Sequence, residues 1–182
     1  TDANYSFHGE YIDDYSGWVV ASAGDVDGDG LSDIMIGAPE NEYAGPGAYP
    51  GPGMVYLLFA TTILAGASAD IYLEDADYIF YGEDTADYHG ESLAPAGDVD
   101  GDGLADILIG ANSNDDTDVG AGKSYLWLGS TITASSDHTL SSGDADYAFL
   151  GEVASDRSGY ALSSAGDVDG DGLADVLIGA YQ

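Results

Sequence analysis

The chain lacks cysteine entirely and has only two basic residues, Lys123 and Arg157, among 182. Without cysteine, no disulfide can cross-link the fold, and zinc loses its thiolate ligands. The 34 acidic residues give a formal net charge of −32. A surface this acidic repels nucleic acid and anionic membranes, so both are poor candidates as partners. No apolar run approaches the ~20 residues that a membrane-spanning helix needs, so membrane insertion is not expected.

No leader sequence is visible, and the sequence starts at Thr1 without an initiating methionine and stops at Gln182 within a repeat. We therefore expect a processed or partial product of a longer polypeptide. Charge this high opposes compaction, and either bound divalent cations or a salty medium would offset it. A halophilic origin thus competes with cation loading as an explanation of the acidity.

Three internal repeats organise the chain. The segment 23–38 recurs with few changes at 96–111 and again at 165–180, and such self-similarity is typical of repeat architectures. A Tyr-x-Phe-x-Gly-Glu marker precedes each copy. We expect a single array over 1–182, with repeat 1 at about 3–75, repeat 2 at about 76–144 and an incomplete repeat 3 at about 145–182.

The apolar pattern predicts an all-β fold. Residues 33–37, 106–110 and 175–179 are short apolar runs that end in glycine, which is typical of strands covered on both faces. With the run at 54–59 and the alternating marker, each repeat offers about four strands, the content of one propeller blade. At most one helical turn is expected, within 60–69.

Each repeat also carries an aspartate-rich loop, which in the first copy reads Asp-Val-Asp-Gly-Asp-Gly-Leu-Ser-Asp. Carboxylates at loop positions 1, 3, 5 and 9 can converge on one Ca²⁺ ion, which takes six to eight oxygen ligands. The leucine at position 7 is expected to offer its backbone carbonyl and to place its side chain in the core. The predicted metal ligands are Asp25, Asp27, Asp29, Leu31, Asp33, Asp98, Asp100, Asp102, Leu104, Asp106, Asp167, Asp169, Asp171, Leu173 and Asp175.

Other interpretations of this loop are weaker. An EF-hand requires Glu at position 12 and flanking helices, whereas position 12 here is Ile36, Ile109 or Ile178 inside a β-like run. A plain Asp/Gly turn without metal would leave four carboxylates repelling one another in each of three copies. Zn²⁺ lacks nearby His or Cys, and Mg²⁺ stays open although it prefers a smaller, water-rich shell.

The marker and the loop together resemble the FG-GAP repeat of the integrin α-subunit β-propeller and its bacterial relatives. Phe-x-Gly occurs at 7–9, 80–82 and 149–151, and Gly-Ala-Pro is complete only at 37–39. The resemblance implies blades of four antiparallel strands, Ca²⁺ between the first two strands of a blade (about three ions in all), and an extracellular adhesive role. Some such repeats occur in lectins and beside enzyme domains.

The repeat count implies an open array of about two and a half blades, because closed propellers need four to eight. We expect the missing strands to come from another copy, head to tail in a ring or filament, or from a longer chain. The leading hypothesis for function is a non-enzymatic, extracellular structural or adhesive module. The alternatives are a carbohydrate- or protein-binding, lectin-like module and the accessory part of a larger secreted enzyme.

No catalytic or organic-cofactor site is predicted. The three histidines do not recur at equivalent repeat positions, and no nucleophile-elbow motif is present. Asn4 begins a glycosylation sequon, and the Ser/Thr-rich stretch 131–142 is expected to be a flexible or O-glycosylated loop. Five loop tyrosines are candidates for contacting a sugar or a protein, although blade packing is the favoured role: Tyr11, Tyr15, Tyr43, Tyr49 and Tyr88.

Overall fold

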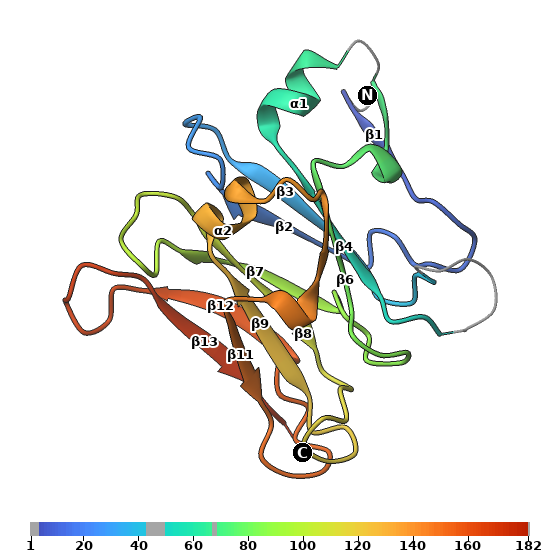
Figure 1. The fold of residues 1–182 in the computed structure, drawn as a ribbon, viewed down its shortest axis with the longest axis vertical. Helices are drawn as coiled ribbons and strands as arrows, with labels where there is room; N and C mark the ends of the chain where they lie inside the picture. The colour runs from blue at the N-terminus through green and yellow to red at the C-terminus, as the bar shows by residue number, and fades with distance from the viewer. Residues whose placement is uncertain (1–3, 43–49, 67–68, 182) are drawn as a thin grey trace.

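The computed structural model describes residues 4–42, 50–66 and 69–181. It confirms the all-β expectation: two four-stranded antiparallel blades and a final strand pair lie side by side (Figure 1). Among the described residues, no helix is long and apolar enough to cross a membrane.

The first blade has the strand order β2-β3-β4-β6, and every neighbouring pair is antiparallel. Its strands are β2 (Val19–Gly24), β3 (Asp33–Ala38), β4 (Met54–Leu58) and β6 (Tyr78–Tyr81). The two middle strands are the continuous apolar runs of the sequence, and all five residues of β4 are buried. Burial on both faces explains why these runs lack alternation.

The second blade repeats this order one repeat later, as β7-β8-β9-β11. Its strands are β7 (Ser92–Gly97), β8 (Asp106–Ala111), β9 (Lys123–Trp127) and β11 (Tyr147–Leu150). Each blade's first strand pair contains a bulge just before the aspartate loop, between Ser22 and Gly24 and between Pro95 and Gly97. Gly24 and Gly97 have φ angles of 81° and 87° there, a conformation that glycine adopts without strain.

The third blade has only two described strands, β12 (Ala161–Gly166) and β13 (Asp175–Gly179). At the other end, β1 (Ser6–His8) carries the first Tyr-x-Phe-x-Gly marker and pairs with none of the strands of the first blade. It pairs instead, in parallel, with β5 (Asp70–Tyr72). The equivalent of β5 in the next repeat is β10 (Thr139–Ser141), and it pairs in parallel with β6.

The linkers between the third and fourth strands are therefore more ordered than expected. The helical turn expected within 60–69 is present as α1 (Ala60–Ala65). The stretch 131–142, expected to be a loop, instead holds most of α2 (Gly129–Ala134), all of β10 and the start of the 3₁₀ turn η2 (Ser142–Asp144). A matching 3₁₀ turn, η1 (Leu73–Asp75), follows β5. In each repeat, the linker between the third and fourth strands thus adds a short strand in parallel to the marker strand that begins the repeat, which is β1 in the first repeat and β6 in the second.

The main core lies between the two complete blades and includes Val55, Phe80, Ile107 and Trp127, all at most 1% exposed. Equivalent positions show what the neighbouring blade contributes. Met35 and Leu108 are fully buried, whereas Leu177 of β13 is 59% exposed. At the opposite end, Val20 is 64% exposed, although its equivalent Leu93 is buried. Both end faces thus keep the apolar residues that cover a neighbour elsewhere in the array.

Candidate metal centre

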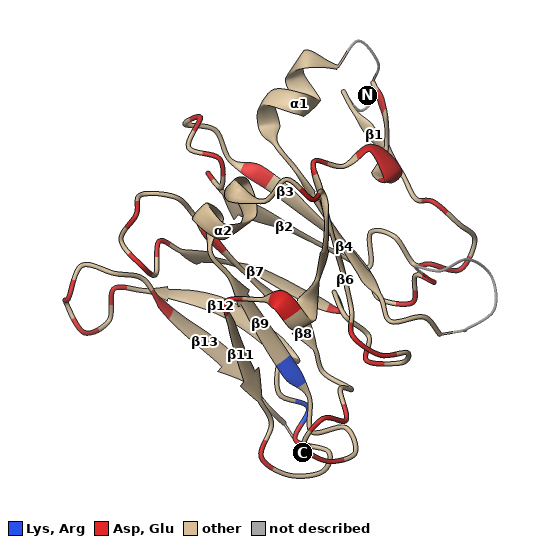
Figure 2. Ribbon diagram, in the orientation of Figure 1, with Lys and Arg blue, Asp and Glu red and all other residues tan. Residues whose placement is uncertain are grey.

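The three aspartate loops join the first two strands of each blade, and they project in chain order from one side of the molecule (Figure 1). Acidic residues lie mainly in such connections, while the strands carry few charges (Figure 2). A loop that leaves one strand and immediately enters its antiparallel neighbour must turn tightly. Its aspartates are thereby brought close together.

The carboxylates of each loop accept hydrogen bonds from the backbone N–H groups of the same loop. In the first copy, Gly30 N–H donates to Asp25 Oδ2 at 2.9 Å, and Leu31 N–H donates to Asp29 Oδ1 at 2.7 Å. The same bonds recur in the second and third copies. The glycines at positions 4 and 6 have positive φ angles in every copy, 78° and 88° at Gly28 and Gly30, which explains why the sequence has glycine there.

The aspartate at position 9 connects the loop to the rest of the blade through backbone hydrogen bonds. Asp33 is fully buried and accepts N–H bonds from Val26 at 2.9 Å and from Ala60, the first residue of α1, at 2.9 Å. Asp106 does the same with Val99 and Gly129. Burial raises the pKa of both carboxyl groups, that of Asp106 to about 6. A nearby cation would oppose this shift, because it favours the ionised form.

Three carboxylates of each loop place one oxygen each within 4.8 Å of one another. The groups are Asp25, Asp27 and Asp29; Asp98, Asp100 and Asp106; and Asp167, Asp169 and Asp175. One predicted aspartate per loop stays outside its group: Asp33, Asp102 and Asp171. The structure thus brings together nine of the twelve predicted aspartates.

The donor set fits a hard divalent cation. Within the described structure, Asp25 Oδ1 is buried and has no hydrogen-bond partner. A buried carboxylate oxygen without a donor is costly unless something positive lies against it. The remaining donors are all oxygens, which is the ligand type that Ca²⁺ and Mg²⁺ prefer. No described residue of these groups is a histidine.

The leucine at position 7 differs from the expectation. Leu31 is 43% exposed instead of entering the core of its own blade. The reason is visible one repeat later: Leu104 reaches back to the first loop, with its Cδ2 only 2.9 Å from the position of a Cβ at Gly28. Leu173 meets Gly101 in the same way. This side chain packs between consecutive loops, and among the described residues Leu31 meets no equivalent loop from a preceding blade.

A backbone hydrogen bond links each loop to the next as well. Ala105 N–H donates to the carbonyl of Asp25 at 2.8 Å, and Ala174 N–H donates to that of Asp98 at 2.9 Å. The loops therefore form a row in which each one is held by its neighbour. A cation in one loop would stiffen the interface with the next blade, since the residue that carries this carbonyl is also a predicted ligand.

The histidine and the loop residues considered from the sequence differ in their exposure to solvent. His89 is fully buried, its Nε2 lies 2.9 Å from Ser142 Oγ, and burial lowers its pKa to about 3. A substrate cannot reach this pair. Asn4 is exposed, as are Tyr11 and Tyr15. Two of the loop tyrosines, Tyr43 and Tyr49, lie outside the described residues.

Comparison with known proteins identifies the family. The FG-GAP repeat family matches residues 16–58, 89–127 and 158–182, more than half of the chain. Each match begins shortly before the first strand of a repeat and includes its aspartate loop. The chain belongs to the FG-GAP repeat family, and its strand pairs are those of β-propeller blades.

Integrin α subunits are among the relatives. The chain is 32% identical to integrin alpha-PS2 of Drosophila melanogaster over 98% of its own length, which spans 12% of that protein. It is also 32% identical to integrin alpha-4 of Xenopus laevis over 95% of its length, or 15% of the relative. Phosphatidylinositol-glycan-specific phospholipase D of Rattus norvegicus is 34% identical over 89% of the chain and 18% of that enzyme. The chain thus spans less than a fifth of each of these relatives.

Proposed function

We propose that each aspartate loop binds one Ca²⁺ ion, about three in all. The observation that carries this proposal is the threefold convergence of carboxylates around Asp25, Asp98 and Asp167, with a buried, unpartnered oxygen on Asp25. The ligands in each copy are the four aspartates and the leucine carbonyl predicted from the sequence. Three ions would change the formal net charge from −32 to −26.

Bound Ca²⁺ supplies positive charge and rigidity, and performs no chemistry in this proposal. It holds the first two strands of each blade together and relieves the repulsion among the aspartates. Because binding favours the folded state, each site filled at 100 times its Kd adds about 2.7 kcal/mol to the free energy of unfolding. Thermal unfolding in excess Ca²⁺ and in excess chelator tests this, and an identical Tm in both would contradict it.

We infer further that the chain is a non-enzymatic, extracellular module with an adhesive or structural role. The support is its relation to integrin α subunits over nearly its whole length. Immobilised protein can be tested for Ca²⁺-dependent binding to a panel of extracellular matrix proteins. Binding to one of them that is lost on chelation supports the role. No binding to any, together with hydrolysis of a phosphodiester or glycoside substrate, would contradict it.

We also propose that neighbouring FG-GAP repeats pack on both end faces. The row of loops has half of a contact at each end. Among the described residues, Leu31 covers no glycine of another loop, and Gly170 has no atom within 4 Å of a Cβ position. These are the two halves of the contact that Leu104 makes with Gly28. The partner is either a second copy, head to tail, or further repeats of a longer chain.

A second copy and a longer chain differ in the number of strands that they can add to the third blade. A second copy would bring β1 to the pair β12-β13, which makes three of the four strands of a blade. Light scattering with Ca²⁺ present provides the test. Oligomers that dissociate in chelator would support the second copy, whereas a monomer would assign both faces to a longer chain. The proposed array has repeats at about 3–75, 76–144 and 145–182.

Glycan binding is the second candidate function. It is favoured by the aromatic side chains exposed on the loops at the end of the blades opposite the aspartate loops. Tyr11, Tyr15 and Trp18 are 61%, 48% and 59% exposed. An accessory role beside an enzyme domain is compatible with the relation to a phospholipase D, and the sequence of the complete protein would test it.

A further inference from the structure

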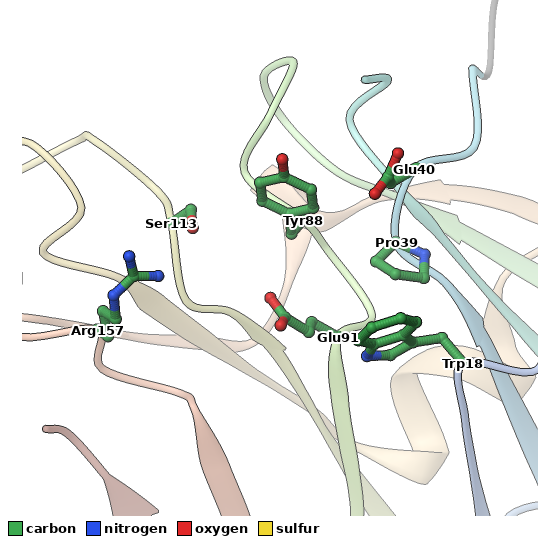
Figure 3. Close-up of a pocket in the computed structure, with 7 residues that line it drawn as sticks. All are labelled: Trp18, Pro39, Glu40, Tyr88, Glu91, Ser113 and Arg157. Carbon is green, nitrogen blue, oxygen red and sulfur yellow. The ribbon is translucent and has the colours of Figure 1, made fainter. Parts of the chain in front are cut away.

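A pocket of about 330 Å³ opens where the three repeats meet, at the end of the blades opposite the aspartate loops. Trp18 and Glu40 line it from the first blade, Tyr88 and Glu91 from the second, and Arg157 from the third repeat (Figure 3). These residues precede the first strand or follow the second strand of their blade, whereas the aspartate loops join the same strands at their other ends. The pocket is therefore separate from the candidate metal centre. Its volume is at the lower end of the range for small-molecule sites.

A repeated backbone turn fixes two of the side chains in this pocket. Tyr88 and Arg157 occupy equivalent positions in consecutive repeats, and their φ angles are 56° and 51°. Non-glycine residues rarely adopt such angles, which persist only where the surroundings enforce them. A glycine with positive φ, Gly90 or Gly159, follows two residues later in each copy. The turn thus gives Tyr88 and Arg157 the same backbone conformation in the two repeats.

The polar groups of the pocket have unmet hydrogen-bonding capacity. Within the described structure, Glu40 Oε2 is buried without a hydrogen-bond partner. No carboxylate that the structure describes lies within 4.0 Å of the Arg157 guanidinium, although such ion pairs form elsewhere in the chain. In Figure 3 the Glu91 carboxylate lies between Trp18 and Arg157. The pocket thus offers a fork of N–H donors and two carboxylate acceptors.

We propose that this pocket binds a sugar ring that bears one carboxylate, such as a uronic acid at the end of a glycan. The sugar carboxylate pairs with the Arg157 fork, a geometry that suits two parallel N–H···O bonds. Sugar hydroxyls donate to the carboxylates of Glu40 and Glu91, and Ser113 offers a further hydroxyl. The apolar face of the ring covers the indole of Trp18, whose ring is rigid and 59% exposed. This proposal rests on the second candidate function, glycan binding, and does not depend on Ca²⁺ binding.

Overall charge restricts the ligand to a single acidic group. A net charge of −32 repels a polyanion, but salt screens this repulsion beyond about 8 Å at physiological ionic strength. Close recognition of an anion then requires a local base. Lys123 is buried and already paired with two carboxylates, so the exposed Arg157 is the base that a ligand can reach. An acidic peptide offers the same carboxylate but lacks the ring and its hydroxyls.

Ligand-observed NMR with two matched probes tests the proposal: methyl β-D-glucuronide and methyl β-D-glucoside, which differ only at carbon 6, which is part of a carboxylate in the first and of a hydroxymethyl group in the second. We expect the glucuronide to bind about tenfold more tightly or better, because it gains a charge-assisted, bidentate pair. Arg157→Gln should remove that preference. Arg157→Lys keeps the net charge and loses the fork, so it should remove most of the preference as well.

Two further variants separate the contribution of the Trp18 side chain from that of the Arg157 charge. Trp18→Ala should weaken both glycosides by similar factors, whereas Tyr147→Ala, which removes an equally exposed aromatic outside the pocket, should change neither. Equal affinity for the two glycosides, or a glucuronide affinity unchanged in Arg157→Gln, would overturn the proposal. So would binding of a glutamate-rich peptide through Arg157 without any binding of the glucuronide. The Ca²⁺ stoichiometry, measured on the same variants, should stay unchanged in every case.

Discussion

Replacing Lys123 with methionine should destabilise the second blade. The lysine is 7% exposed, and its ammonium group donates to Glu83 and, at 2.7 Å, to Asp116. Burial disfavours the charged form, but the bonds to these carboxylates outweigh it and raise the pKa of Lys123. Methionine is the natural residue at the equivalent position of the first blade, Met54, so the shape of the side chain fits. The substitution therefore removes charge with little change in packing.

The expected loss can be worked out from these contacts. Each hydrogen bond to a charged group contributes about 1.5–3 kcal/mol. The side chains of Glu83 and Asp116 are 24% and 40% exposed, so water compensates part of the loss, and removal of the lysine also removes its own desolvation cost. We expect the free energy of unfolding to fall by about 2–3 kcal/mol. For a chain of this size that lowers Tm by about 4–12 °C.

Urea unfolding at fixed Ca²⁺ concentration measures this effect, and Arg157→Gln is the matched control. Both substitutions remove one positive charge, but Arg157 is exposed and belongs to no ion pair among the described residues. The control should change the free energy of unfolding by at most about 0.5 kcal/mol. An equal loss in both variants would show that net charge, and not the buried pair, sets the stability. No loss in Lys123→Met would show that the bonds from Lys123 to Glu83 and Asp116 do not stabilise the blade.

Further predictions concern pH and the packing between loops. Because burial raises the pKa of Asp106 to about 6, protons should compete with the cation, so Ca²⁺ affinity at the second loop should fall as the pH drops below about 6. Titrations from pH 5 to 8 would show this, and a flat profile would contradict it. Gly101→Ala and Gly170→Ala place alanine at the same strained φ, 82° and 83°, but only the first meets Leu173. Thermal unfolding should therefore show a greater loss for Gly101→Ala, by about 1 kcal/mol, and equal losses would argue against packing between loops.

The four-stranded blade and the aspartate loop could be predicted because both depend on local signals repeated three times. The strands β3 and β8 are continuous apolar runs, and the loop glycines accompany the aspartates in every copy. The three-residue strands β5 and β10 were missed, since so short a strand has no usable periodicity. These strands are formed by parallel pairing with β1 and β6. The paired residues lie about 60 residues apart in the chain, so no local signal marks them.

Leu31 and the pocket show two further limits of the sequence. The leucine at loop position 7 was predicted to enter the core of its own blade, and this is wrong for Leu31, which is 43% exposed. In the next two repeats, Leu104 and Leu173 pack against the preceding loop instead. The pocket combines side chains from three repeats, so no short motif marks it. A signal was nevertheless present: Tyr15, Tyr88 and Arg157 occupy equivalent repeat positions, and the change to arginine in a chain with two basic residues singles out that position.

Calorimetric titration of Ca²⁺ into chelator-stripped protein tests directly whether each aspartate loop binds one ion, with the stoichiometry as the readout. We expect three ions per chain. We expect two ions when Asp98 and Asp100 are both replaced by asparagine, with the first and third loops still filled. Fewer than three ions in the original chain, or three ions in the double variant, would contradict the assignment of one ion to each aspartate loop.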